Sequence, residues 1–148
     1  MTPGPVLVSG LAALLVAALL GAAIGAEREW RRHPGGLRSS ALVAGAACLF
    51  ARLVAVHAPG NVGAGLGAIA TGVGFLGAGV IMRQGAQVRG LSTAATFWAV
   101  AAIGTAAGLD EFTLAVGLTL VVFFAHVALR PLSAFIERVA PPEDDGPR

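Results

Sequence analysis

The sequence predicts an all-α fold, a membrane-embedded bundle of about five transmembrane helices. Three features indicate this class. Of the 148 residues, 56% are hydrophobic and only 12% are charged, whereas about a quarter of a typical soluble domain is charged. The apolar residues form long runs, while a soluble helical bundle would place a charged face along each helix. The ten basic residues are all arginine and gather mainly in alternate connections between these runs, a pattern typical of membrane proteins.

Five segments are long and apolar enough to cross a bilayer, which takes about 20 mostly apolar residues. Arg52 is the only arginine or acidic residue within them. The first segment lacks the basic leading region of a signal peptide and is followed by arginines, so we expect it to be retained as a span. The predicted spans are 6–26, 39–56, 63–82, 91–109 and 112–129.

Beyond the fifth span the composition changes. Residues 1–130 form the predicted transmembrane domain, and residues 131–148 form a polar tail. The last part of this tail, from Pro141 to Arg148, consists mainly of proline and acidic residues. Such a composition cannot bury enough apolar surface to fold, so we expect this end to be disordered.

The placement of arginine predicts the orientation of the spans. The first and third connections and the tail contain arginines, while the second and fourth connections contain none. Because cytoplasmic loops carry the excess of basic residues, we expect the N-terminus outside and the C-terminus and tail in the cytoplasm. Arg52 lies near the outer end of its span, and we expect its side chain to snorkel to that interface. Asp110 and Glu111, in the fourth connection, are expected to be solvated.

The segment 72–81, GVGFLGAGVI, contains four glycines in ten residues. A P-loop would need a lysine, and the sequence contains none. In lipid, helices associate by close packing, and glycines let their backbones approach each other. We therefore expect a helix-packing face, and the alternative is a locally broken helix that lines a polar path. The glycines predicted to pack are Gly21, Gly25, Gly72, Gly74, Gly77 and Gly79, and glycine pairs of the same kind are Gly63 with Gly67 and Gly104 with Gly108.

Charged residues close the first span at its cytoplasmic end, in the sequence Glu27-Arg28-Glu29. One interpretation is a structural cluster, in which a glutamate turns inward and pairs with Arg38 or Arg83 from the neighbouring connections. A second is interfacial capping, because each glutamate has a basic residue four positions further on. A third is an ion-binding carboxylate, although adjacent arginines would repel Mg²⁺, which prefers oxygen ligands. The predicted cluster is therefore Glu27, Arg28, Glu29, Arg38 and Arg83.

The segment His33-Pro34-Gly35-Gly36 predicts a turn, because proline fixes φ and glycine permits positive φ. His33 is expected to be a polar loop residue, with pH sensing as the alternative. His126, near the cytoplasmic end of the fifth span, is expected at the interface or on a proton path. The threonine hydroxyls that open the fourth span can form hydrogen bonds across helices. The turn and span-start motifs are His33, Pro34, Gly36, Gly90, Thr93 and Trp98, with Thr96 nearby.

Several motifs resemble the MgtC/SapB family of bacterial inner-membrane proteins. Residues 21–29, GAAIGAERE, and 33–43, HPGGLRSSALV, resemble its first signature. Residues 72–83, GVGFLGAGVIMR, and 88–98, VRGLSTAATFW, resemble its second. The order and spacing also match, and the resemblance covers residues 6–130. It implies a domain of about five spans; some members add an ACT-like C-terminal domain, which we do not expect in this chain.

The resemblance implies a role in growth under magnesium limitation and in bacterial survival inside host phagocytes. Members of the family are described as acting on the proton-translocating ATP synthase. The sequence itself offers no catalytic or metal-spaced constellation, and we expect no enzyme activity, metal or cofactor. Cys48 is expected to be a small core residue. A net charge of +2 does not suggest nucleic acid as a partner.

Two functions from different classes then compete. The first is a rigid protein of the bacterial inner membrane that binds and modulates another membrane complex. The second is a transporter of Mg²⁺, H⁺ or a small solute, acting as a homo-oligomer because five spans leave little room for a private pathway. The middles of the predicted spans contain no charged residue, and intramembrane charges commonly mark transport paths. The first function is therefore favoured, with the bilayer and another membrane protein as partners.

Overall fold

The structure is a computed structural model that describes residues 4–85 and 87–139. Its helices are α1 (Gly4–Trp30), α2 (Leu37–His57), α3 (Val62–Val80), α4 (Leu91–Gly108) and α5 (Phe112–Val139), with a 3-10 helix at Pro59–Asn61. The strands β1 (Met82–Gln84) and β2 (Gln87–Arg89) form an antiparallel hairpin before α4. All five α-helices contain stretches long and apolar enough to cross a membrane, which confirms the predicted all-α membrane bundle.

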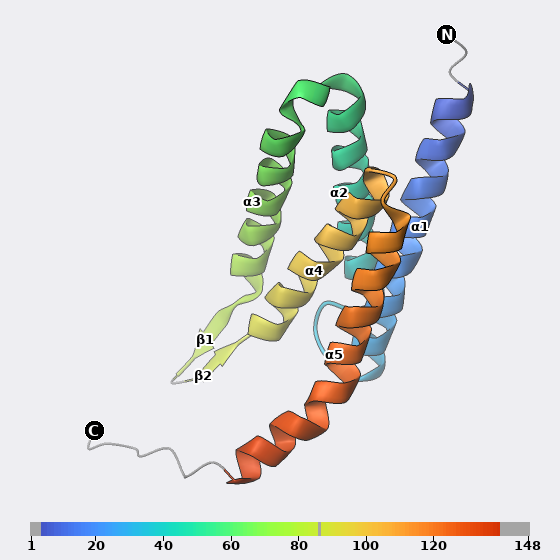
Figure 1. The fold of residues 1–148 in the computed structure, drawn as a ribbon. Helices are drawn as coiled ribbons and strands as arrows, with labels where there is room; N and C mark the ends of the chain where they lie inside the picture. The colour runs from blue at the N-terminus through green and yellow to red at the C-terminus, as the bar shows by residue number, and fades with distance from the viewer. Residues whose placement is uncertain (1–3, 86, 140–148) are drawn as a thin grey trace.

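Helix α4 lies at the centre of the bundle. It packs against α1, α2, α3 and α5, and Figure 1 shows α3 standing apart on one side of it. Half of the apolar window of α4 is buried, compared with 11% for α3 and 17% for α5. Helices α3 and α5 therefore present most of their surface to the surroundings of the bundle.

Helix α2 touches the backbones of two neighbouring helices through glycines. A Cβ atom added to Gly21 of α1 would lie 2.6 Å from the Ser40 carbonyl oxygen. One added to Gly104 or Gly108 of α4 would collide with the carbonyl oxygens of Ala44 or Cys48. Because only glycine permits this approach, α1, α2 and α4 form a tightly packed unit.

The interior of the bundle is rich in small side chains, although Ile24, Val100 and Ile103 are also buried, and many large apolar side chains point outward. The buried cluster includes Ala13, Ala17, Ala44 and Cys48, and Cys48 is a buried free thiol, as predicted for a core residue. Leu19, like many other large apolar side chains, is mostly exposed. In lipid, close helix contact selects small residues for the interior, while large apolar residues are compatible with the acyl chains outside.

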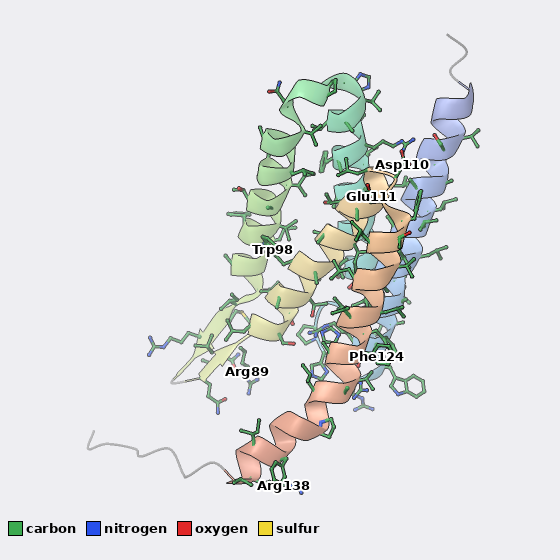
Figure 2. All side chains as sticks on the ribbon, in the orientation of Figure 1. Arg89, Trp98, Asp110, Glu111, Phe124 and Arg138 are labelled. Atoms are coloured by element: carbon green, nitrogen blue, oxygen red, sulfur yellow. The ribbon has the colours of Figure 1, made fainter. Side chains whose placement is uncertain are left out.

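The two ends of the bundle differ in charge. The α1–α2 turn, the β1–β2 hairpin and the end of α5 lie at one end, and the chain's first helix begins at the other (Figure 1). Figure 2 shows Arg89 and Arg138 at the first end and Asp110 and Glu111 at the opposite one. We call the first the arginine-rich end, made of residues 28–38, 82–85, 87–90 and 130–139. The positive-inside rule predicts that it faces the cytoplasm.

At the end opposite the arginine-rich end, Arg52 is held by partners and does not simply snorkel to the interface. Its Nη1 donates to Asp110 Oδ1 and its Nη2 donates to Ser9 Oγ, both at 2.8 Å. Asp110 was expected to be only solvated, but it forms this ion pair from the α4–α5 turn. The arginine thus connects α2 with α1 and with that turn.

Two further features differ from the predicted elements. The third connection contains the β1–β2 hairpin, which the sequence analysis does not predict. Helix α5 continues through Pro131 to Val139, so the first part of the expected tail is helical. The predicted disordered end, Pro141 to Arg148, lies outside the described residues.

The backbone contact between α4 and α2 predicts that Gly104→Ala destabilises the protein. The added methyl group would meet the Ala44 carbonyl oxygen, and overpacking of this kind costs about 1–3 kcal/mol. Gly74→Ala is the matched control, because a Cβ there meets no atom of the described residues within 4 Å. That variant should be neutral or gain up to about 1 kcal/mol from higher helix propensity. Thermal unfolding in detergent distinguishes the two, and equal midpoints would contradict the predicted contact.

Candidate functional site

Polar side chains from α1, α4 and α5 meet at the arginine-rich end of the bundle. They surround a pocket of about 320 Å³ that also reaches the α1–α2 turn. We call it the polar pocket. The residues that line it are Glu27, Arg28, Arg31, His33, Ser92, Ala125, His126 and Leu129.

Arg28 is the buried charge of this site, with only 3% of its surface exposed. Its Nε and Nη2 donate to the Pro34 carbonyl oxygen at 3.1 and 3.0 Å. Nη2 also donates to Thr93 Oγ1 at 2.9 Å, and Nη1 donates to Ser92 Oγ at 3.3 Å. The guanidinium thereby joins α1 to the α1–α2 turn and to the first turn of α4.

The α1–α2 turn is shaped to supply the Pro34 carbonyl oxygen. Gly35 has φ of +81°, a left-handed conformation that glycine adopts without strain. A Cβ atom at Gly35 would also lie 2.9 Å from Thr93 Cγ2. Helix α2 begins after Gly36, and Glu29 Oε2 accepts a hydrogen bond of 2.9 Å from Leu37 N. Glu29 therefore caps α2 from the preceding helix, because the first backbone N–H groups of a helix have no partner within it.

Glu27 connects two elements on the other side of the pocket. Its Oε1 forms an ion pair with Arg31 Nε, one helical turn further along α1. Its Oε2 lies 3.5 Å from His126 Nδ1 on α5. His126 Nε2 in turn lies 3.2 Å from Thr96 Oγ1 on α4. A polar chain from α1 through α5 to α4 results.

The expected pairing of Glu27 or Glu29 with Arg38 or Arg83 is wrong. Arg38 and Arg83 are exposed, and Arg83 Nε donates to the Gly85 carbonyl oxygen within the hairpin turn at 3.1 Å. Arg28 takes the inward position instead and binds neutral oxygens. The capping interpretation is closer to the structure, since the Glu27–Arg31 pair is present.

The buried face of α1 would have identified Arg28 as the inward residue. Ala13, Ala17, Gly21, Ile24 and Arg28 are all buried, and they recur at the spacing of one helix face. Extending the apolar stripe by one turn places Arg28 on it. Consecutive residues point about 100° apart on a helix, so Glu27 and Glu29 lie off this stripe.

Of the four glycines of segment 72–81, only Gly77 packs inside the chain as predicted. A Cβ added to Gly72, Gly74 or Gly79 would meet no atom of the described residues within 4 Å. Gly77 is buried, and its added Cβ would make an ordinary contact of 3.4 Å with Ala94. In contrast, Gly25 of α1 lies against the backbone at the start of α2.

The remaining motif residues are structural or exposed. His33 lies in the turn, is exposed, and has Nδ1 at 3.0 Å from the Arg31 carbonyl oxygen. Gly90 has φ of +94° at the start of α4, where a Cβ would collide with the Val80 carbonyl oxygen. Trp98 is 53% exposed and lines an apolar crevice between α3 and α4. Figure 2 shows its position on this side of α4. Within residues 4–85 and 87–139, no group of three or more His, Cys, Asp or Glu side chains is placed to hold a metal ion.

Five apolar helices with a polar pocket at one end define a multi-pass membrane protein of the helical class. The chain belongs to the MgtC family, whose family model matches residues 14–135. This match covers both signature motifs and confirms the resemblance found in the sequence.

Relatives from different organisms match most of this chain. The chain is 47% identical over 126 residues to Protein MgtC of Salmonella typhimurium, covering 85% of this chain and 54% of that protein. It is 43% identical over 130 residues to Protein MgtC of Brucella abortus, covering 85% and 53%. An uncharacterized protein of Synechocystis is 45% identical over 128 residues, covering 83% and 53%. The chain thus spans about half the length of these relatives, and no solved structure matches it.

The hydrogen bonds of Arg28 predict that Arg28→Ala destabilises the protein strongly. The substitution leaves Thr93 Oγ1 without its donor, and the Pro34 carbonyl oxygen retains only a long hydrogen bond of 3.4 Å from Thr93 Oγ1. The loss should cost about 2–4 kcal/mol. Arg28→Lys should restore only part of this loss, because one ammonium group cannot reproduce the planar fork of donors. Arg38→Ala is the control and should remain within about 0.5 kcal/mol of the parent protein. Yield and thermal unfolding in detergent measure the difference, and equal losses for Arg28 and Arg38 would contradict this assignment.

Proposed function

We propose that this protein lies in a bacterial inner membrane, binds another membrane complex there and modulates it without enzymatic activity. The family resemblance links this role to adaptation to low Mg²⁺ or to acid and host stress. The observation that carries the proposal is a face of α3 on which small residues are exposed.

The face consists of Gly63, Gly67, Gly74 and Ala78, and we call it the small-residue face of α3. These residues are exposed and recur four or seven positions apart, which places them on one side of the helix. Added Cβ atoms at the three glycines would meet no atom of the described residues within 4 Å. The backbone of α3 is therefore accessible along several turns.

A transmembrane helix of another membrane protein fits this face. In lipid, large apolar residues gain nothing from leaving the acyl chains, whereas glycine-lined backbones gain close van der Waals contact with a second helix. The same kind of glycine contact already joins α1 and α4 to α2 inside the bundle. The small-residue face of α3 thus offers outward the type of contact that holds the interior together.

An apolar groove runs beside this helix. It lies between α2 and α3, has a volume of about 670 Å³ and is lined by large side chains such as Leu42, Phe50 and Leu76. The α3 residues that line this groove lie on the side of the helix opposite the small-residue face, since consecutive residues are about 100° apart around a helix. The groove and the face are therefore separate surfaces, and the proposal rests on the face alone.

A crosslinking experiment tests this proposal. A photoreactive residue in place of Phe75, which is 80% exposed beside the small-residue face, should crosslink to one defined membrane protein in native membranes. The same residue in place of Leu19, on the exposed side of α1, should not. Gly74→Leu should abolish the crosslink without lowering thermal stability, whereas Gly117→Leu on α5, also in open space, should leave it intact.

The product identifies the occupant of the face. A product at the mass of this chain plus another membrane protein, lost in Gly74→Leu, supports the proposal. A product at twice the mass of this chain would show that the face binds a second copy, and lipid adducts alone would show that it faces acyl chains. Either of these results contradicts the proposal.

Transport of Mg²⁺ or H⁺ is the second candidate function. The polar pocket favours transport because the carboxylate of Glu27 and the imidazole of His126 line the pocket. Arg28 and Arg31 line the same pocket and would repel a divalent cation. We therefore expect proteoliposomes containing the purified protein to show no more Mg²⁺ or H⁺ flux than those containing Glu27→Gln. A flux that requires Glu27 would reverse the order of the two candidates.

A further inference from the structure

Glu27 and His126 face each other across the polar pocket and connect α1 with α5. Oε2 of Glu27 and Nδ1 of His126 are 3.5 Å apart, and only 10% and 21% of the two side chains are exposed. Among the residues that the structure describes, His126 Nδ1 is buried and has no hydrogen-bond partner, whereas Glu27 Oε1 has the ion pair with Arg31. Buried polar atoms are nearly always hydrogen-bonded, so the Nδ1 atom beside Glu27 Oε2 lacks an expected partner.

The contacts of Thr96 determine which imidazole nitrogen carries a hydrogen. Thr96 Oγ1 donates its single proton to the Ser92 carbonyl oxygen at 2.7 Å. Its oxygen can therefore only accept from His126 Nε2, at 3.2 Å, and Nε2 must carry the hydrogen. In the neutral imidazole the other nitrogen, Nδ1, then has a lone pair. Nδ1 lies 3.5 Å from Oε2 of Glu27.

Two acceptors that face each other in a buried pocket repel unless a proton lies between them. We propose that Glu27 and His126 form a proton-binding site, in which a proton bound at Nδ1 makes an imidazolium whose ion pair with Glu27 Oε2 fastens the end of α5 to α1. The proton comes from hydronium in the solution at the arginine-rich end. Its binding forms one N–H bond at Nδ1, leaves water behind and breaks no bond within the chain. The site closes as the pH falls and opens as it rises.

The charged groups around the pair are consistent with a single proton. Arg28 and Arg31 on α1 and His33 in the α1–α2 turn line the pocket together with Glu27. Helix α4 contributes only the neutral groups Ser92 and Thr96. The carboxylate of Glu27 favours a proton on His126, while the arginines oppose additional positive charge. A monovalent proton therefore suits this environment better than a divalent cation, which needs more oxygen ligands than this pocket supplies.

The pair is placed where it can change the conformation of the bundle. Only 17% of the apolar window of α5 is buried, so α5 is more weakly held than α4. The link to Glu27 lies near the cytoplasmic end of the α5 span, beside Leu129 of the same pocket. Loss of the proton from His126 Nδ1 would remove its ion pair with Glu27 and loosen this end of α5 from α1. The inference concerns α5 and does not depend on the partner proposed for α3.

Nitrogen-15 NMR of the histidine rings in nanodiscs tests the proton site. The chain has three histidines, and the exposed His33 and His57 can be assigned with His33→Gln and His57→Gln. Nε2 of His126 should carry a hydrogen throughout the titration, and Nδ1 should gain one as the pH falls. In Glu27→Gln this gain should move to lower pH by about one unit or more, because the nearby negative charge is removed.

Glu29→Gln is the matched control. Glu29 is on the same helix and carries the same charge, but its Oε2 binds Leu37 N, so the titration of His126 should change little. An unchanged titration in Glu27→Gln, or a neutral ring with hydrogen on Nδ1 instead of Nε2, would overturn the proposal. Should Glu27→Gln not fold, the parent protein still decides between these outcomes. Hydrogen on Nε2 of its neutral ring supports the proposal, and hydrogen on Nδ1 overturns it.

A distance measurement tests the mechanical consequence. Spin labels at Trp30→Cys and Phe135→Cys, both exposed positions, report the separation of α1 and α5 in a Cys48→Ala background. The distribution should be narrow below the titration midpoint of His126 and broader above it. His126→Ala should be broad at every pH. A distribution of spin-label distances that does not change with pH would refute a proton site. So would a distribution that narrows only when Mg²⁺ or Zn²⁺ is added at constant pH.

Discussion

Backbone contact between α2 and its two neighbours is the constraint on which the rest of this structure depends. Lipid removes most of the hydrophobic drive for helix association, so contact must come from close packing. Gly21 of α1 and Gly104 and Gly108 of α4 allow it, because any larger residue would strike a carbonyl oxygen or side chain of α2. Helices α1, α2 and α4 thereby form a rigid core. Helices α3 and α5 attach to this core by smaller surfaces and retain most of their exposed area.

Polar interactions complete the core at both ends, where the cost of burying charge is lower than at the bilayer centre. Arg52 joins α2 to Ser9 and Asp110 at one end. Arg28 joins α1 to the α1–α2 turn and to α4 at the other. With the core held in this way, the two peripheral helices are free to carry function. In the two proposals made for these helices, α3 offers its accessible backbone to a partner, and α5 responds to a proton bound by His126 at the arginine-rich end.

The sequence predicted where in the bundle the candidate site lies, but not which of its residues turn inward and pair. The charged residues after the first span and the histidine near the end of the fifth pointed to the correct region of the bundle. The pairing within it was wrong, because Arg28 and not Arg38 or Arg83 turns inward. Each step along a helix rotates a side chain by about 100°. The direction of a charged triplet is therefore set by the packing of the whole helix, which a local motif does not specify.

The sequence by itself determined the number of helices, their membrane-spanning character and the expected orientation, because these follow from run length, apolarity and the position of arginine. Only the tertiary structure decided which glycines are covered. Gly25 and Gly79 lie in similar glycine-rich segments. Gly25 lies against the start of α2, whereas a Cβ atom added to Gly79 would meet no atom of the described residues within 4 Å. Glycine makes close approach possible from any side, so the partner helix is chosen by the arrangement of all five. The same arrangement brought Glu27 and His126 together from opposite ends of the chain.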